Sequence, residues 1–311
     1  MHIYIHSVFQ ETERNLLRSH LATKYQLSFG NELPEEQRKE TFLQADICFG
    51  NVPLDWATDT PQLQWLQLHS AGIDPYNKIV NHRFPITNLK GFFGQSVAET
   101  TLAGILAVYR GIDKLAVWQQ EKHWIGTPLR SSLHLLQHAK VLILGAGAIG
   151  LSIQKLLTGF DCDTKVFARK TGEHNLSMDN LNEYLPTADI LIACLPETPQ
   201  TLGLINEALL SQLPSHALFV NVGRGSAVDE LALIALLNKQ TISGAVLDVT
   251  LEEPLPKESP LWEMPNVLLT QHTSGGWAEE SRDKVLFFLR NLTRFEHGEP
   301  LINVVDWEKG Y

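Results

Sequence analysis

A glycine-rich turn in the middle of the chain constrains the fold more than any other feature of the sequence. The segment "KVLILGAGAIG" places Gly145, Gly147 and Gly150 directly after an apolar run and at the start of an amphipathic stretch. In this setting the first glycine permits a tight turn, the second lets the backbone approach a pyrophosphate, and the third lets the helix pack on the strand. The N–H groups at the helix N-terminus then face the anion. We therefore predict a dinucleotide-binding βαβ unit, in which Ala148 and Ile149 are further contacts.

Apolar runs on both sides of this turn alternate with helical segments, which is typical of parallel sheets. One series is "KVLILG", "TKVFAR", "ADILIACLP", "HALFVNVG", "TISGAVLDV" and "NVLLTQH"; an earlier one is "HIYIHSV", "ADICFG", "LQWLQLHS" and "FPITNL". A long helical pattern over about 96–122 separates them, and a last helix over about 276–297 precedes "LINVV", which we expect to return to the first domain.

These series predict an α/β protein with two doubly wound parallel-sheet domains. We expect a flavodoxin-like substrate domain made of residues 1–97 and 281–311, with a Rossmann dinucleotide-binding domain, residues 98–280, inserted in it.

Composition limits the partners of the chain. With 311 residues, of which 44% are hydrophobic, it can bury one core in each of two domains. Its 25 basic and 35 acidic residues disfavour nucleic acid and anionic membranes as partners, so we expect small-molecule partners.

Cys48, Cys162 and Cys194 are scattered and lie in or beside apolar stretches, which predicts buried free thiols. Because the sequence shows no leader pattern and no run of eighteen apolar residues, we expect a cytoplasmic protein.

The end of the second strand after the glycine turn predicts which dinucleotide binds. NAD-binding domains place an acidic residue there, about twenty residues after the turn, to accept from the ribose hydroxyls. Here "TKVFA" ends at Ala168 without an acid, and Arg169 and Lys170 follow. Two cations suit a 2′-phosphate, so we predict a preference for NADP(H), with NAD(H) possible. The alternative is that these two cations only solvate the strand end.

Three polar side chains follow three later strands of this domain, where ligands of open α/β sheets bind. Arg224 lies in "NVGRGSA", Glu253 in "LDVTLEEPL" and His272 in "LLTQHTSGG". Each alone has a structural explanation, as a solvated loop residue or a cap. Together they suit reduction of a 2-oxo acid: a guanidinium binds a carboxylate, and a carboxylate favours an imidazolium that protonates a carbonyl oxygen.

At this point the chain resembles the D-isomer-specific 2-hydroxyacid dehydrogenases. The glycine turn, "NVGRG", "LDVxxEEPL" and "TxH" followed by small residues occur in the family's order, and the likeness covers nearly the whole chain. The resemblance implies that Arg224 binds and polarises the substrate, that His272 is the general acid/base, and that Glu253 orients His272. It also implies that the backbone amides of Ser70, Ala71 and Gly72, in "LHSAGID", hold the substrate carboxylate.

The resemblance implies further cofactor contacts. Leu195, Pro196 and Thr201 lie in "LPETPQT", which is similar to the family segment beneath the cofactor, and Val222 and Asp248 lie in the two motifs around Arg224 and Glu253. The chain also departs from the family. Phe93 and Gly94 replace the usual polar residues of "GFFGQSVAET", Gln271 stands where a proline usually precedes the histidine, and Trp277 follows the small residues. These departures affect the expected substrate pocket, and Trp277 can either line the site or pack.

The segments "EEPLPKESPLWEMPNVLLTQH" and "VVDWEKGY" are similar to the bacterial glyoxylate/hydroxypyruvate reductase branch, which implies an NADPH-dependent reductase and a homodimer. Two alternatives stay open: an NAD-linked dehydrogenase of a larger 2-hydroxy acid, and a dinucleotide-sensing binding protein without turnover.

His134 and His138, four residues apart in "HLLQH", are more typical of a helix face than of a metal site, and we predict no metal.

Overall fold

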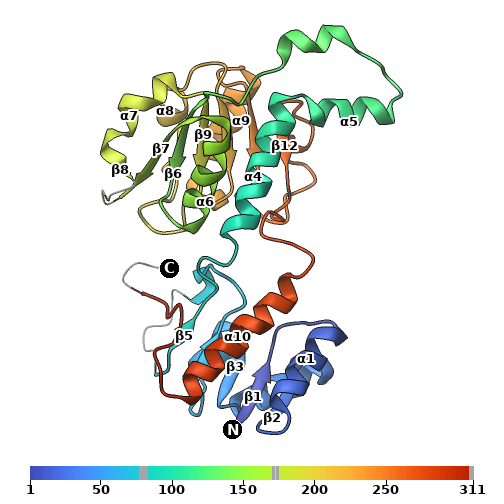
Figure 1. Ribbon diagram of the computed structural model, residues 1–311, viewed down its shortest axis with the longest axis vertical. Helices are drawn as coiled ribbons and strands as arrows, with labels where there is room; N and C mark the ends of the chain where they lie inside the picture. Colours follow the sequence, from blue (N-terminus) through green and yellow to red (C-terminus); the bar gives the residue numbers. More distant parts are fainter. Residues whose placement is uncertain (77–82, 170–171, 173–174, 308–311) are drawn as a thin grey trace. The chain divides into compact units, whose positions relative to one another are not determined.

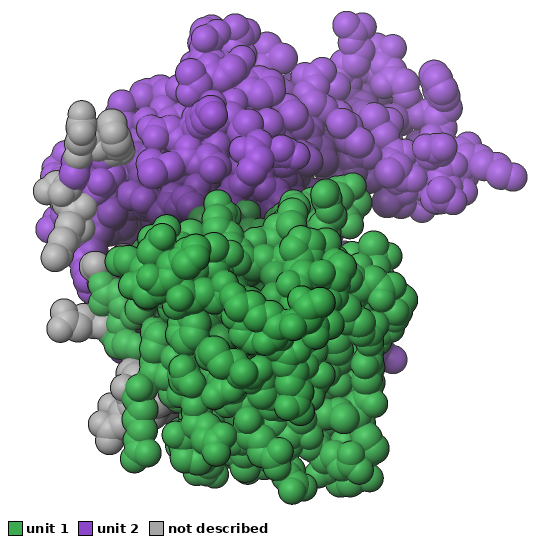
Figure 2. Space-filling view, turned by 60° about the horizontal axis from the view of Figure 1, so that its bottom comes forward, with its two compact units in different colours: residues 1–92, 277–311 green, residues 93–276 purple. Residues whose placement is uncertain are grey.

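The computed structural model describes residues 1–76, 83–169, 172 and 175–307. The chain divides into two compact units, unit 1 (Met1–Phe92 and Trp277–Tyr311) and unit 2 (Phe93–Gly276), which Figure 2 distinguishes by colour. Each unit is built around its own parallel sheet (Figure 1). None of the helices in the described part of the chain combines the length and apolar character needed to span a bilayer.

The sheet of unit 1 has the strand order β2-β1-β3-β4-β5 and is parallel throughout. This is the flavodoxin-like order, as expected. The strands are β1 (His2–Ile5), β2 (Gln26–Phe29), β3 (Ile47–Phe49), β4 (Trp65–Gln67) and β5 (Ile86–Thr87), and the helices are α1 (Glu11–Leu21), α2 (Glu35–Leu43), α3 (Leu54–Thr58) and α10 (Glu280–Glu296). Strand β2 was missed in the sequence because "QLSF" is an edge strand whose first residue is exposed.

Alternate residues of these strands point to opposite faces, and each face has its own apolar cluster. Helix α10 covers one face, where the rings of Phe49 and Phe288 stack with centroids 4.5 Å apart. The chain after α10 returns to the sheet, as expected for "LINVV": Val305 N–H donates to Ile86 O at 2.9 Å, and Val304 bridges Thr87.

The sheet of unit 2 has the strand order β12-β11-β10-β9-β6-β7-β8, in which every pair of neighbours is parallel. Strand order reverses at β6, which carries the glycine turn, as in a Rossmann fold. The strands are β6 (Lys140–Leu144), β7 (Asp163–Ala168), β8 (Leu176–Ser177), β9 (Ile190–Ala193), β10 (Leu218–Asn221), β11 (Gly244–Leu247) and β12 (Val267–Leu269). The helices are α4 (Gly94–Tyr109), α5 (Ile112–Gln120), α6 (Ala148–Leu157), α7 (Leu181–Tyr184), α8 (Glu207–Leu210) and α9 (Glu230–Asn238). All six strands predicted here are present, and the two-residue β8 is additional.

The single long helix predicted over about 96–122 is wrong. The chain forms α4, which packs against α6, and a separate α5, because Gly111 between them has a φ of 64° and ends the helical path. No residue of α5 is buried. Figure 1 shows α5 and the chain after it extending away from the body of unit 2.

Two smaller expectations also need correction. The last helix begins at Glu280, not near residue 276. All three cysteines are free thiols, as expected, but only Cys48 is buried, whereas Cys162 and Cys194 are of intermediate exposure.

Candidate active site

The glycine turn between β6 and α6 has the geometry that an anion site requires. Gly145 has a φ of 118°, and a side chain there would lie 2.7 Å from Cys194 O. A Cβ on Gly150 would overlap Gly145 O, whereas a Cβ on Gly147 would meet open space. Among the described residues, none accepts a hydrogen bond from the N–H groups of Ala146, Gly147 or Ala148. The turn therefore presents unpaired donors at the start of a helix, and these fit the pyrophosphate of a dinucleotide.

The end of β7 carries the predicted specificity residues. Ala168 ends the strand, and Arg169 follows with its side chain exposed. Lys170 lies outside the described residues. A cation at this strand end fits a 2′-phosphate, and the position lacks the carboxylate that would repel one.

The loop after β9 is closed by its own side chains. Thr201 Oγ1 donates to Pro196 O at 2.7 Å and accepts from Thr198 N–H at 2.9 Å. The hydroxyl of Thr201 therefore shapes the loop, and a cofactor contact through it stays a prediction. Leu195 is 8% exposed and lies beside the next loop, since a Cβ on Gly223 would fall 2.6 Å from its amide nitrogen.

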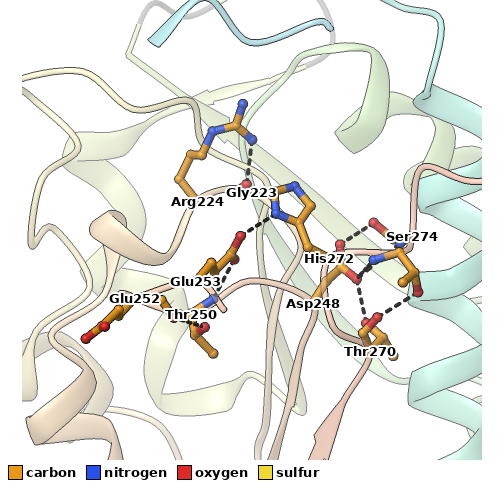
Figure 3. Close-up of polar contacts among 10 residues, drawn as sticks. Gly223, Arg224, Asp248, Thr250, Glu252, Glu253, Thr270, His272 and Ser274 are labelled. Carbon is orange, nitrogen blue, oxygen red and sulfur yellow. Dashed lines mark hydrogen bonds and ion pairs between the residues drawn. The ribbon is translucent and has the colours of Figure 1, made fainter. Parts of the chain in front are cut away.

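Arg224 stands between two glycines, each required by close packing. Gly223, after Val222, has no room for a side chain beside the β9 loop, and a Cβ on Gly225 would overlap Thr250 O. The buried Asn221 at the end of β10 fixes both flanks: its Oδ1 accepts from Gly223 N–H and its Nδ2 donates to Arg224 O, each at 3.1 Å. Arg224 Nη1 donates to Gly223 O at 2.9 Å (Figure 3). The backbone that carries the guanidinium is thus held on both sides.

His272 and Glu253 form a direct pair. His272 Nδ1 lies 2.6 Å from Glu253 Oε2, and the carboxylate points at the ring in Figure 3. Glu253 Oε1 accepts from Thr250 N–H at 3.0 Å, which fixes the carboxylate. Both side chains are accessible, with 53% of the His272 side chain and 35% of the Glu253 side chain exposed. Because Nδ1 is engaged by the carboxylate, Nε2 is the nitrogen left to exchange a proton with a substrate.

Asp248, predicted as a cofactor contact, holds the loop that carries His272. It is 3% exposed and follows β11. Its Oδ1 accepts from Thr270 Oγ1 at 2.7 Å, Thr273 N–H at 3.1 Å and Ser274 N–H at 3.2 Å, and its Oδ2 accepts from Ser274 Oγ. These hydrogen bonds satisfy both oxygens of a buried carboxylate.

In unit 1, the loop after β4 also presents free donors. Among the described residues, none accepts from the N–H groups of Ser70, Ala71 or Gly72. Asn51 fixes the loop: its Oδ1 accepts from His69 N–H at 3.0 Å and its Nδ2 donates to Ser70 Oγ at 2.9 Å. Unpaired backbone amides are suited to binding a carboxylate, so these three stay the predicted carboxylate contacts.

The His69 ring beside this loop is uncharged at neutral pH. Its Nδ1 lies 2.8 Å from Ser7 Oγ. Burial, together with the charge of Lys284, lowers the pKa of His69 to about 4. The His69 ring therefore adds no positive charge to this loop at neutral pH.

The positions at which the chain departs from the family make packing contacts. Trp277 contacts Phe92, with ring centroids 4.9 Å apart, and its Nε1 donates to Asp283 Oδ2 at 3.2 Å. Gly94 begins α4 close to α6, and a Cβ there would lie 3.2 Å from Ala148 O. The Phe93 ring lies against Gly275, where a Cβ would be 3.2 Å from it.

The prediction that His134 and His138 share a helix face is wrong, because neither residue is helical. Across the described residues, no three His, Cys, Asp or Glu side chains gather so as to hold a metal ion.

A Rossmann unit with unpaired donors at its glycine turn, and a histidine–carboxylate pair in the same unit, define an NAD(P)-binding dehydrogenase. The model of the D-isomer specific 2-hydroxyacid dehydrogenase NAD-binding domain matches residues 102–274. The chain belongs to this family of NAD(P)-binding enzymes.

Relatives of the chain support this membership. It is 34% identical over 291 residues to an uncharacterised protein from the proB 3′ region of Corynebacterium melassecola, covering 88% of this chain and 93% of the relative. It is 31% identical over 223 residues to glyoxylate/hydroxypyruvate reductase A of Salmonella newport, covering 70% of each.

A solved structure of a D-isomer specific 2-hydroxyacid dehydrogenase from Xanthobacter autotrophicus, in complex with NADPH and MES, has the same fold. It is 27% identical, covers 99% of both chains and superposes with a TM-score of 0.83.

Proposed function

We propose that this protein is an NADPH-preferring reductase of small 2-oxo acids such as glyoxylate or hydroxypyruvate, giving the D-2-hydroxy acid where the product is chiral. The 2.6 Å pair of His272 and Glu253 is the observation that carries the proposal, because it supplies an oriented proton donor. The similarity to the Salmonella reductase supports this substrate class. The rate of NADPH oxidation with glyoxylate and hydroxypyruvate tests it.

Each residue of the site has a distinct role in this proposal. When bound, the reduced nicotinamide supplies the hydride for the 2-carbon of the substrate. Arg224 binds the 2-oxo acid and polarises its carbonyl, because a guanidinium can form two charge-assisted hydrogen bonds. The N–H groups of Ser70, Ala71 and Gly72 bind a carboxylate. His272 gives a proton from Nε2 to the oxygen that becomes the hydroxyl, and Glu253 stabilises the imidazolium before transfer.

Arg169 is proposed to bind the 2′-phosphate of NADPH, and its removal should change cofactor preference. We expect Arg169→Ala to lower kcat/KM for NADPH by about tenfold to a hundredfold, since a hydrogen bond to a charged group contributes about 1.5–3 kcal/mol, and to leave kcat/KM for NADH little changed. Lys165→Ala is the matched control: Lys165 is a cation on β7, the strand that Arg169 follows, and it pairs with Asp163 at 2.8 Å. Equal losses with both cofactors, or no loss, would mean that Arg169 only faces solvent.

The exposed apolar side chains of the segment around α5 support a homodimer. Trp124 is 92% exposed, and Ile112, Leu115 and Val117 on α5 are 42–57% exposed. Several exposed apolar side chains on one segment are a feature of protein interfaces. We expect Trp124→Ser to shift the protein from dimer toward monomer in light scattering, whereas Trp262→Ser, at a tryptophan 45% exposed elsewhere in unit 2, should not. A wild-type protein that is monomeric at micromolar concentration would overturn this proposal.

Two other functions remain as outcomes of these assays. Turnover only with NADH and a larger 2-oxo acid would indicate an NAD-linked dehydrogenase, and cofactor binding without turnover would indicate a dinucleotide sensor.

The three free thiols support a reducing, cytoplasmic location, which we propose for this enzyme.

A further inference from the structure

The loop of residues 70–72 in unit 1 has an uneven pattern of hydrogen bonds. Each of its carbonyl groups accepts one: Ser70 O from Leu89 N–H at 2.9 Å, Ala71 O from Asn88 Nδ2 at 2.8 Å, and Gly72 O from Ser70 Oγ at 2.7 Å. The three N–H groups, in contrast, have no acceptor among the described residues. The loop is therefore held by its acceptors, and its donors stay available to a ligand.

The side chain of Asn88 sets the direction of one of these donors. The peptide between Ala71 and Gly72 is planar and trans, so its C=O and its N–H point in opposite directions. Because Asn88 Nδ2 holds Ala71 O, the Gly72 N–H is turned to the opposite side of the peptide. In the same way, Leu89 N–H holds Ser70 O and sets the direction of the Ala71 N–H.

Asn88 is itself fixed where the chain leaves β5. It directly follows that strand and is only 2% exposed. Its Oδ1 accepts from Lys90 N–H at 3.0 Å, and its own N–H donates to Asn303 O at 3.1 Å. The orientation of its side-chain amide is therefore determined, because the oxygen faces an N–H donor and the nitrogen faces a carbonyl.

We propose that Asn88 is a positioning residue for substrate binding: its side-chain amide holds Ala71 O and thereby aims the Gly72 N–H at the carboxylate of the 2-oxo acid. Asn88 does not touch the substrate itself, since it is buried and both its oxygen and its nitrogen are engaged. This inference rests on the proposed function, in which the N–H groups of residues 70–72 bind that carboxylate.

Two variants of Asn88 remove the hydrogen bond to Ala71 O. Asn88→Asp keeps the size of the side chain and the acceptor for Lys90 N–H, but it sets an oxygen against Ala71 O. Asn88→Ala removes the donor without adding a charge, and it decides the question if the buried aspartate prevents folding.

The effect of both variants should appear in KM. The substrate carboxylate is not the reacting group, so its contacts stabilise the bound substrate and the transition state alike. We expect the KM for glyoxylate to rise by about tenfold, the usual effect of losing a hydrogen bond to a charged group, and kcat to stay within about threefold of the wild type.

Asn291 is the matched control for a loss of stability. It is also a buried asparagine of unit 1, 0% exposed, and its Nδ2 donates to Gln67 Oε1 at 3.0 Å and to Ile302 O at 3.1 Å. Asn291→Asp and Asn291→Ala should lower the Tm but leave the KM of the folded enzyme unchanged, because their partners lie outside residues 70–72. The Kd for NADPH, measured by fluorescence, should be unchanged in the variants at both positions.

A binding measurement tests the proposal without turnover. The probe is oxamate, a 2-oxo acid analogue whose amide carbonyl is not reduced, added to the complex with NADPH. Its Kd should rise by about tenfold in the Asn88 variants and not in the Asn291 variants. In the wild type, oxamate should shift the backbone ¹H–¹⁵N signals of residues 70–72, and the shift of Gly72 should be lost in Asn88→Ala.

Two results would overturn the proposal: a wild-type KM and oxamate Kd in the folded Asn88 variants, or equal rises in the Asn88 and Asn291 variants. A wild-type protein that binds oxamate at residues 70–72 but reduces no 2-oxo acid would instead contradict the proposed function, and the oxamate comparison would still decide the role of Asn88.

Discussion

Replacing His272 by alanine is expected to lower kcat for reduction of glyoxylate by roughly 10²-fold or more, the usual contribution of a general acid. Cofactor binding should change little, because the imidazole contacts Glu253 and lies on a different loop from the glycine turn. Single-turnover measurement of NADPH oxidation separates the chemical step from product release.

The chain offers a close control for this variant. His216 also pairs with a carboxylate, Asp189, at 2.9 Å, and its side chain is 55% exposed against 53% for His272. His216→Ala should therefore leave kcat unchanged. Glu253→Gln should cost less than His272→Ala, roughly tenfold, because the amide oxygen still accepts but the bond is no longer charge-assisted. Near-normal kcat in His272→Ala would contradict the assigned role.

The second large effect is expected at Arg224. Arg224→Ala should lower kcat/KM for the 2-oxo acid by roughly 10²- to 10³-fold, as for loss of a donor that stabilises developing negative charge. Arg224→Lys should recover only part of this loss, since an ammonium keeps the charge but not the planar fork. Most of the change should appear in the KM for the oxo acid and in kcat, with the Kd for NADPH unaffected.

Arg110 is the matched control for Arg224. Its Nη1 donates to a backbone carbonyl, His134 O, at 3.2 Å, much as Arg224 Nη1 donates to Gly223 O. Arg110→Ala removes the same chemical group from the same unit and should leave kcat/KM unchanged. Equal kinetics for Arg224→Ala and the wild type would remove Arg224 from the substrate site.

The sequence predicted the structure best at positions where the local backbone conformation and the packing of the fold require the same residue type. Gly145 and Gly150 were predictable because a tight turn and close helix packing tolerate no side chain, and the structure has the contacts that exclude one. The buried strands were equally predictable from continuous apolar runs. His272 and Glu253 could be grouped because parallel strands end at one edge of a sheet, but the 2.6 Å distance depends on loop geometry that spacing does not encode.

Other features lacked such a signal. The helical pattern over about 96–122 predicted one continuous helix, but periodicity does not reveal what covers an apolar face or that Gly111 turns the backbone. The role of Asp248 was missed because its partners lie on a loop 22 to 26 residues later in the chain. The left-handed backbone of Gln271, with a φ of 54°, was not predictable, since Gln rarely adopts it.

The central claim is NADPH-dependent reduction of a small 2-oxo acid, and one measurement tests it most directly. The initial rate of cofactor oxidation should be measured with glyoxylate and with hydroxypyruvate, using NADPH and NADH in parallel, with chiral analysis of the glycerate formed from hydroxypyruvate. The account predicts turnover of both substrates, a clear preference for NADPH and D-glycerate as the product. No turnover of either substrate, or L-glycerate, would contradict it.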